Sequence, residues 1–275
     1  MKVMDAPVYD SARRQPPMFE ELFDIVRYRD LVVQLVRRDI VTRYKRSVFG
    51  VAWTMLQPLA MMMVLTIAFS QVLGTTRSYA AYTLSGLVFW QFFAQTTMMA
   101  SRQLIAGGSL LHRIYIPKTL FAFSAIGTGL IHMLLSLIPM GVVMVATGTP
   151  LRLTALLLPV PILFLVAFSL GIGLLISAGA AYFPDVNEIY EIVLSAWMYL
   201  TPIIYQEDII PESARFFVLT LNPMHHLLRL FRLILYQGVW PSSTQLASAV
   251  VAAFTTLAIG WIVFTRKANE LAYRV

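Results

Sequence analysis

Long uncharged stretches set the pattern of this chain. Thirty residues separate Arg46 from the next charged side chain, Arg77, and comparable uncharged stretches recur at 78–101, 119–151, 153–184 and 233–265. A helix of about 20 apolar residues crosses the roughly 30 Å of hydrocarbon in a bilayer, so each stretch is long enough to span it. We therefore expect an all-α integral membrane protein.

Six transmembrane helices follow from this pattern, at roughly 50–73, 82–104, 121–146, 154–180, 187–206 and 244–265. The fifth is short, because only fifteen uncharged residues lie between Glu191 and Glu207. A span there requires Glu188 and Glu191 to lie at the cytoplasmic boundary of the membrane. The prediction is a six-span transmembrane domain over 50–265, followed by a cytoplasmic C-terminus over 266–275.

The basic residues orient these spans. Of the 21 Lys and Arg residues, sixteen fall in segments that six spans place on one side of the membrane, and five fall on the other. Basic residues concentrate on the cytoplasmic side, so we expect both termini in the cytoplasm. The net charge of +7 is then explained by topology, and no nucleic-acid partner is expected.

The amino-terminal region divides into two parts. Residues 1–18 combine three prolines with mixed charges, which predicts a mobile cytoplasmic tail. From 19 to 49, apolar residues recur at helical spacing opposite Arg27, Asp30 and Arg38, which predicts an amphipathic helix at the membrane interface. No early apolar core is present, so a cleavable signal peptide is not expected.

Within the stretch 207–243, residues 219–236 are apolar enough to enter a bilayer, yet they carry Asn222-Pro223, two histidines and two arginines. A full crossing would upset the charge balance of the two sides. Short helices that dip into the outer leaflet satisfy their backbone without crossing. We therefore predict a re-entrant extracytoplasmic helical hairpin before the last span.

Most residue types and motifs typical of enzyme active sites are absent from the sequence. The chain has no cysteine, only four histidines and no Gly-Lys dipeptide for a phosphate-binding loop, so we expect neither a metal nor a bound cofactor. Gly171-x-Gly173 lies inside an uncharged span, where helix packing explains it better than nucleotide binding. His132 stands alone in the third span, which favours an interhelical hydrogen bond over a proton relay.

Several motifs resemble one known family. Residues 35–50 read Leu-Val-Arg-Arg-Asp-Ile-Val-Thr-Arg-Tyr-Lys-Arg-Ser-Val-Phe-Gly, and they are followed by Trp53 and Gln57-Pro58-Leu59. This string closely resembles the amino-terminal signature of type 2 ATP-binding-cassette permeases that export polysaccharides. The resemblance extends from about residue 20 to 270 through Ile116-Pro117-Lys118, Thr201-Pro202-Ile203-Ile204-Tyr205, Leu221-Asn222-Pro223-Met224 and Phe231-Arg232. Pro184-Asp185 departs from it, because the family often has Arg-Asp there.

The resemblance implies a permease subunit and its partners. It implies a homodimer joined to two copies of a separate ATPase, which would bind ATP and Mg, whereas this chain would bind no cofactor and would not be an enzyme. The cargo would be a lipid-linked polysaccharide of the O-antigen or teichoic-acid type. The location would be the bacterial inner (cytoplasmic) membrane, in contact with its lipids.

The same resemblance directs attention to three groups of residues. Coupling to the ATPase would use the interface helix and a coupling loop over 105–120. The simpler interpretation of the helix is a lipid anchor, and that of the loop is an ordinary cytoplasmic turn. Aromatic rings and neutral polar groups inside the membrane are suited to a glycan, although such rings more often serve packing. The candidates for coupling are Arg38, Asp39, Arg43, Tyr44, His112, Pro117 and Lys118; those for the substrate path are Gln57, Trp90, Phe93, Trp197, Tyr199 and Tyr205; those for an outer gate are Asn222, His225, His226, Arg229 and Arg232.

Three alternatives remain open from the sequence. The same fold serves exporters of drugs, small lipids or peptides. A membrane-bound acyltransferase or glycosyltransferase would use His132 or His225. A membrane anchor without transport would leave the aromatic fifth span unexplained.

Overall fold

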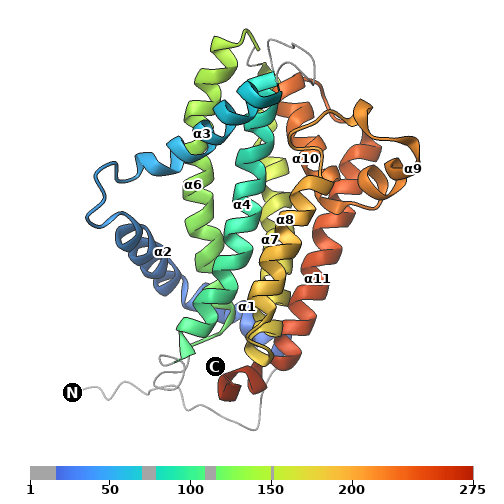
Figure 1. Cartoon of the computed structure of the whole chain (residues 1–275). Helices are drawn as coiled ribbons and strands as arrows, with labels where there is room; N and C mark the ends of the chain where they lie inside the picture. Colours follow the sequence, from blue (N-terminus) through green and yellow to red (C-terminus); the bar gives the residue numbers. More distant parts are fainter. Residues whose placement is uncertain (1–16, 70–78, 109–115, 150–151, 275) are drawn as a thin grey trace, which may run out of the picture.

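The computed structural model describes residues 17–69, 79–108, 116–149 and 152–274, and within these ranges the regular elements are helical (Figure 1). The α-helices are α1 (Pro17–Arg27), α2 (Arg29–Tyr44), α3 (Ala52–Phe69), α4 (Tyr79–Ala106), α6 (Thr119–Ala146), α7 (Pro159–Tyr182), α8 (Val186–Leu200), α9 (Glu212–Arg215), α10 (Pro223–Arg232) and α11 (Ser243–Arg274). Two 3₁₀-helices, η2 (Leu153–Leu157) and η3 (Glu207–Ile209), and two π-helices, η4 (Phe216–Thr220) and η5 (Leu233–Gln237), connect them.

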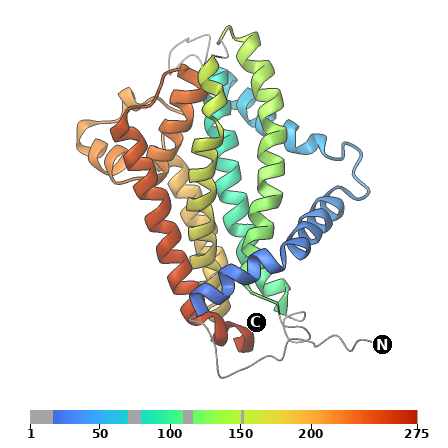
Figure 2. The same ribbon diagram turned by 180° about the vertical axis from the view of Figure 1, so that it is seen from behind.

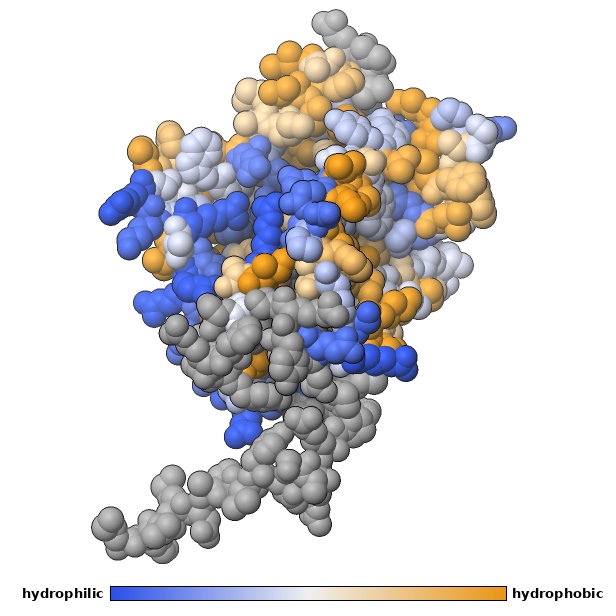
Figure 3. Space-filling view, turned by 60° about the horizontal axis from the view of Figure 1, so that its bottom comes forward, coloured by the Kyte–Doolittle hydropathy of each residue, from blue (hydrophilic) through white to orange (hydrophobic). Residues whose placement is uncertain are grey.

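The long helices form a bundle with α4 in its interior. α4 packs along both α6 and α7, and α7 packs along α11 (Figures 1 and 2). We call the end that carries α1 and the last turns of α11 the lower end, and the end that carries α9 the upper end (Figure 1). Hydrophilic side chains gather at the lower end, and hydrophobic side chains lie toward the upper end (Figure 3).

Four of the described segments are long and apolar enough to cross a membrane: α3, α6, η2 with α7, and Ser243–Lys267 of α11. The expectation of an all-α membrane protein is confirmed, and these four correspond to the first, third, fourth and sixth predicted spans. α4 has 28 residues but is less apolar. α8 has 15 residues, which gives about 22 Å of helix, less than the hydrocarbon thickness.

The polar residues of α4 explain both its lower hydropathy and its central position. The hydroxyl group of Thr96 donates to the carbonyl of Phe92 at 2.7 Å, and that of Thr97 donates to Phe93 at 2.8 Å. A hydroxyl that bonds to its own helix adds little bulk, so neighbouring helices can approach closely. Gly129 of α6 lies directly against Thr96, and a Cβ at this glycine would collide with the Thr96 methyl group.

Glycines bring α7 and α11 into backbone contact. A Cβ on Gly171 would lie 2.5 Å from the carbonyl oxygen of Thr256, and one on Gly260 would collide with the backbone of Gly171. Gly173 faces α4 instead, where a Cβ would lie 3.2 Å from that of Ala100. The Gly171-x-Gly173 pair therefore packs two different helices against α7, as small residues do between membrane helices.

Replacing Gly171 by Ala is expected to destabilise the bundle, because the added methyl group meets backbone atoms that cannot rotate away. Overpacking of this kind costs about 1–3 kcal/mol. Gly141→Ala is the matched control: it also lies inside a long helix, and a Cβ there meets nothing within 4 Å. Thermal unfolding of the detergent-solubilised variants should show a lower Tm for Gly171→Ala only. Equal Tm values would contradict the close helix crossing.

The amino-terminal segment forms two helices where one was predicted over 19–49. The chain breaks at Tyr28, whose ψ of 19° lies outside the helical range. α1 packs against α11 and α6, whereas α2 packs mainly against α6. The hydroxyl of Thr119 donates to the Glu21 carboxylate at 2.6 Å, and burial raises the pKa of this carboxyl group. The two helices diverge because each follows a different docking surface.

The middle of the predicted coupling loop over 105–120, residues 109–115, lies outside the described residues. His112 and the short helix expected after Gly107-Gly108 fall there, as does most of the predicted tail over 1–18. Pro117 and Lys118 are described and directly precede α6. Both residues lie at the lower end of the bundle. They are close to α1, because the next residue, Thr119, contacts Glu21 of α1.

Between α8 and α11 the chain forms short helices at the upper end. α9 and η4 lie at the side of the bundle, and α10 packs against α7, α11 and α4 (Figure 1). The side chains of Met224, Leu227 and Phe231 are fully buried. α10 is thus an internal element of the upper end, in the region where a re-entrant hairpin was predicted.

Candidate functional site

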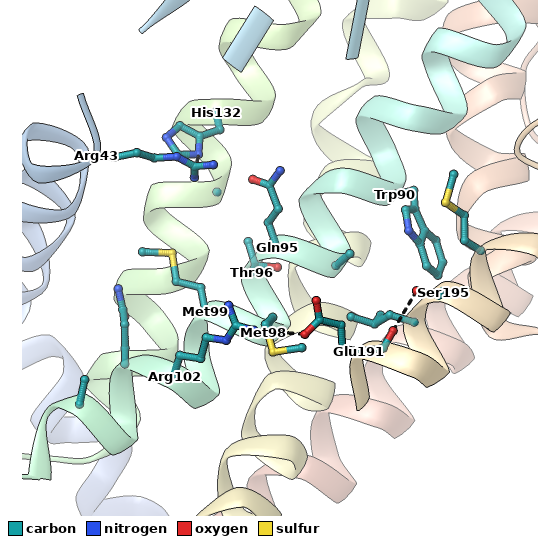
Figure 4. Close-up of a pocket in the computed structure, with 16 residues that line it drawn as sticks. Arg43, Trp90, Gln95, Thr96, Met98, Met99, Arg102, His132, Glu191 and Ser195 are labelled. Carbon is teal, nitrogen blue, oxygen red and sulfur yellow. Dashed lines mark hydrogen bonds and ion pairs between the residues drawn. The ribbon is translucent and has the colours of Figure 1, made fainter. Parts of the chain in front are cut away.

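Two cavities meet at the end of α2. The first has a volume of about 620 Å³ and lies between α2, α4, α6 and α8 (Figure 4). The second has a volume of about 1120 Å³ and lies between the end of α2, α3 and α4. Arg43, Trp90 and Met198 line both. These cavities reach from the lower part of the bundle into the segments that are long enough to span a membrane.

Arg43 points toward His132 of α6 (Figure 4). Its Nη1 lies 3.4 Å from His132 Nδ1, and the hydroxyl of Tyr44 lies 3.2 Å from Nε2 of the same ring. A guanidinium group only donates hydrogen bonds, so Nδ1 must accept and the ring proton lies on Nε2. The interhelical hydrogen bond predicted for His132 is confirmed, and its partners are Arg43 and Tyr44.

Asp39 ties α2 to the bundle. Its Oδ1 accepts from Arg38 at 2.9 Å, and its Oδ2 accepts from Nε2 of Gln103 on α4 at 2.5 Å. Gln103 in turn accepts from the hydroxyl of Ser124 on α6 at 2.8 Å. The Asp39 side chain is only 11% exposed, against 55% for Arg38. These hydrogen bonds connect α2 to two helices that border the first cavity.

α8 closes the other side of the first cavity. Arg102 of α4 and Glu191 of α8 form an ion pair at 3.3 Å, with both side chains more than 60% exposed (Figure 4). Pairs this exposed contribute little stability. The buried bond from the Tyr190 hydroxyl to Thr97 at 2.7 Å fixes α8 more firmly. Glu191 therefore contributes mainly charge to the cavity wall.

The aromatic candidates occupy different environments. Trp90, Phe93, Phe168 and Trp197 form one cluster, with Phe93 and Trp197 centroids 5.3 Å apart. Phe93 is fully buried, so its ring has no free face for a ligand in this conformation. Trp90 lines both cavities. The cluster therefore packs behind the cavity walls, and Trp90 is the cluster residue that lines both cavities.

The remaining path candidates lie apart from this cluster. Gln57 lines the second cavity. Tyr199 is 69% exposed, and Tyr205 donates its hydroxyl to the Tyr199 carbonyl at 2.8 Å. The structure therefore brings Gln57 together with Trp90, and it places the two tyrosines at the end of α8.

Among the outer-gate candidates, His225 and Arg232 are the most deeply buried. Arg232 is only 5% exposed. It donates to the carbonyls of Pro202 at 2.6 Å and Ile203 at 2.9 Å, and its guanidinium lies 3.6 Å from the ring centre of Tyr82. A Cβ on Gly86 would lie 2.6 Å from Nη2 of Arg232. Arg232 thus holds the chain after α8 against α4 and is not open to solvent.

Asn222 connects α8 to α10. Its Oδ1 accepts from Nε1 of Trp197 at 2.9 Å and from the Met224 amide at 3.1 Å, and its Nδ2 donates to Thr201 at 3.0 Å. It is therefore the N-cap of α10. His226 is bonded to the Thr220 carbonyl at 2.9 Å, and Arg229 is exposed.

His225 and Glu207 form a pair at the upper end. The Glu207 carboxylate lies 3.0 Å from His225 Nε2, while Nδ1 lies 2.8 Å from the Leu219 carbonyl. A carbonyl and a carboxylate both accept, so this geometry suits a ring that donates from both nitrogens. The hydrogen bond from His225 lowers the pKa of the Glu207 carboxyl group, against the opposing effect of burial.

Acid is expected to weaken the upper end. A carboxyl group whose pKa is lower in the folded state stabilises the fold above its unfolded pKa, about 4.3 for Glu, and this stabilisation is lost as the pH falls through the folded pKa. Glu207→Gln should therefore lower Tm at about pH 7 and show a smaller further loss below about pH 4 than the wild type. The exposed Glu212→Gln serves as control in the same thermal unfolding series. A variant with the full acid sensitivity of the wild type would contradict this role.

Several residues of the site were not predicted from the sequence. Gln103 and Ser124 carry the contact from α2 to the bundle, and Gln91 and Gln95 line the cavities. A signal was present, because glutamines 91 and 95 are four residues apart and share one face of a helix. Their spacing predicts a polar stripe, but only the position of α2 and α3 shows what that stripe faces.

Comparisons with known proteins place the chain in a family. The family model described as ABC-2 type transporter matches residues 30–236. The chain is 28% identical, over 90% of its length and 96% of the relative's, to the O-antigen export system permease protein RfbA of Myxococcus xanthus. It is 26% identical, over 89% and 93%, to RfbA of Klebsiella pneumoniae, and 24% identical, over 87% and 94%, to the polysialic acid transport protein KpsM of Escherichia coli. The resemblance drawn from the sequence motifs is confirmed: the chain belongs to the ABC-2 type transporter family.

Proposed function

We propose that the chain is the permease subunit of an ABC exporter that moves a lipid-linked polysaccharide, of the O-antigen or teichoic-acid type, across the bacterial cytoplasmic membrane. The observation that carries this proposal is the family match over residues 30–236 together with relatives named for O-antigen and polysialic acid transport. The permease itself is not the enzyme; a separate ATPase subunit binds ATP and Mg and supplies the energy.

Six spans and a cytoplasmic lower end belong to this proposal. In addition to the four apolar spans, α4 and α8 are the second and fifth spans. The short α8 is continued by the chain segment after it, which Arg232 holds at the upper end. The hydrophilic lower end supports a cytoplasmic location for α1, the end of α11 and both termini (Figure 3). The short helices α9 and α10 then form the re-entrant region on the outer side.

The proposed assembly is a homodimer with two ATPase subunits. α2 is the element that fits the transmission of ATPase movement, because it carries exposed basic residues on one side and the Asp39 contact on the other. Arg38 lies on the exposed side, whereas Arg43 and Tyr44 point inward to His132. Pro117 and Lys118, at the lower end before α6, are the second proposed contact with the ATPase. Asn222 and His225 shape the outer gate by holding α10, and His226 and Arg229 lie at its surface.

A deletion strain tests the proposed cargo. Without the chain, lipid-linked glycan should accumulate inside the cell and surface glycan should disappear, and a plasmid copy should restore both. Unchanged surface glycan would contradict polysaccharide export and would favour a drug, small lipid or peptide as the cargo. Analysis of lipid extracts beside whole-cell glycan staining separates loss of export from loss of synthesis.

A further inference from the structure

A small space shares wall residues with both cavities. Its volume is about 20 Å³, and its walls include Arg43, Gln57, Gln91, Gln95 and His132, which come from α2, α3, α4 and α6. A space of this size holds about one water molecule or one small polar group. Four separate helices thus place polar side chains around one small space beside two largely apolar cavities.

Arg43 and Tyr44 have donor groups that no described residue accepts. One N–H of Arg43 is directed at His132 Nδ1, and the other N–H groups of the guanidinium have no partner among the described residues. The Tyr44 hydroxyl accepts from Nε2–H of His132, so its own proton remains to be donated. The site therefore presents a cation and a hydroxyl donor toward the cavities.

The local charge is positive. Among the described residues, the walls of the second cavity and of the small space hold no carboxylate. The first cavity includes Glu191, which is paired with Arg102. A cation next to low-dielectric walls attracts an anion more strongly than one in bulk water. The arrangement suits a phosphate group, whose oxygens match the guanidinium fork.

Three amide side chains lie next to this cation. Gln57, Gln91 and Gln95 make no hydrogen bond within the described part of the chain, although Gln91 and Gln95 are partly buried. An amide both donates and accepts, as a sugar hydroxyl group does. Unpaired amides inside a membrane protein are costly unless a ligand or water satisfies them.

An apolar wall lies on the other side. The second cavity continues along α3 past Leu56, Ala60 and Val64, and Val64 is 61% exposed. A hydrocarbon chain can lie against such a surface while a charged head group remains at Arg43. The site therefore matches an amphipathic ligand with an apolar chain, a phosphate and a polar group beyond it.

We propose that Arg43 and Tyr44 bind the phosphate or diphosphate that joins the lipid to the first sugar, and that Gln57, Gln91 and Gln95 bind the hydroxyl groups of that sugar. The lipid chain lies along α3. This subsite rests on the proposed function, because it assigns the linkage of a lipid-linked glycan to residues of this chain. His132 is a positioning residue, since its Nδ1 and Nε2 orient Arg43 and Tyr44.

Binding measurements on the full chain test the subsite. The protein, with any ATPase subunit that copurifies, is placed in phosphatidylcholine nanodiscs and titrated with a polyprenyl-diphosphate oligosaccharide, sugar-free polyprenyl diphosphate and phosphatidylglycerol. Arg43→Gln should weaken both diphosphate ligands at least about tenfold, as expected for lost charge-assisted hydrogen bonds, and Arg43→Lys should lie between. Arg37→Gln removes the same charge from the exposed side of α2 and should bind as the wild type does.

The glutamines give a second, independent result. Gln95→Leu should weaken only the sugar-bearing ligand, by about threefold or more, whereas Gln34→Leu on the exposed side of α2 should have no effect. Unchanged affinity in Arg43→Gln, or phosphatidylglycerol binding as tight as that of the diphosphates, would overturn the subsite and leave a general head-group contact. A wild-type protein that binds no sugar-bearing ligand would instead contradict the proposed function.

Discussion

Replacing Arg232 by Met is expected to destabilise the upper end strongly. The guanidinium donates to the carbonyls of Pro202 and Ile203 and to Oγ of Ser85, and it stacks on Tyr82. Met fills much of the same volume but donates nothing, so the Ile203 carbonyl loses its side-chain donor and the Pro202 carbonyl keeps only the Tyr82 hydroxyl at 3.3 Å. A buried group left unsatisfied costs about 1–3 kcal/mol. The loss of the other hydrogen bonds and of the contact with Tyr82 adds to this cost, so the total is a large share of a typical folding free energy.

Arg229→Met is the matched control for this change. It removes an arginine from the same helix three residues earlier, where the side chain is exposed. Thermal unfolding of the purified variants should show a strong decrease in Tm for Arg232→Met and little change for Arg229→Met. Gly86→Ala should resemble a weaker form of Arg232→Met, because its methyl group crowds Nη2. Equal stability of the two arginine variants would show that Arg232 does not hold the upper end together.

Replacing Asp39 by Leu is expected to uncouple export from ATP hydrolysis. Asp39 carries the contact between α2 and the bundle through Gln103 and Ser124. Without it, α2 loses its hydrogen bond to α4 and keeps only its contacts with α6, so a movement of α2 biases the bundle less, although the membrane helices keep their own packing. Coupling free energies of about 1–3 kcal/mol correspond to roughly 5- to 150-fold effects, so export should decrease at least about tenfold.

The control for Asp39→Leu is Asp30→Leu on the same helix. Asp30 is 90% exposed and lies 3.9 Å from Arg29, so its loss breaks no contact between helices. Surface glycan and the amount of protein in the membrane are measured together for both variants. Normal surface glycan with Asp39→Leu, at equal protein level, would remove α2 from the coupling route.

The long apolar helices could be predicted from the sequence because charge is excluded from hydrocarbon wherever it lies along the chain. The four segments α3, α6, α7 and α11 are of this kind. The break at Tyr28 could not be predicted in this way, because the apolar periodicity continues through it and the division depends on where α1 and α2 dock. Local pattern carries no information about which distant helix a face will meet.

The candidate site shows the same limit at the level of side chains. Arg43 and His132 were both singled out from the sequence, but 89 residues separate them and only the fold shows that they meet. Phe93 was a reasonable candidate for a glycan path by residue type, yet it is fully buried within the aromatic cluster. Arg232 resembled a gate residue, and its four hydrogen-bonding partners on α4 and after α8 explain the burial of its charge.

Reconstituted transport is the sharpest test of ATP-driven export through this chain. The chain is placed in vesicles with its ATPase partner and a labelled lipid-linked oligosaccharide, and movement of the glycan across the bilayer is followed with and without ATP. We expect movement only when ATP and the ATPase are both present. Full transport by the chain alone, without any ATP-hydrolysing subunit, would contradict its role as a permease driven by a separate ATPase.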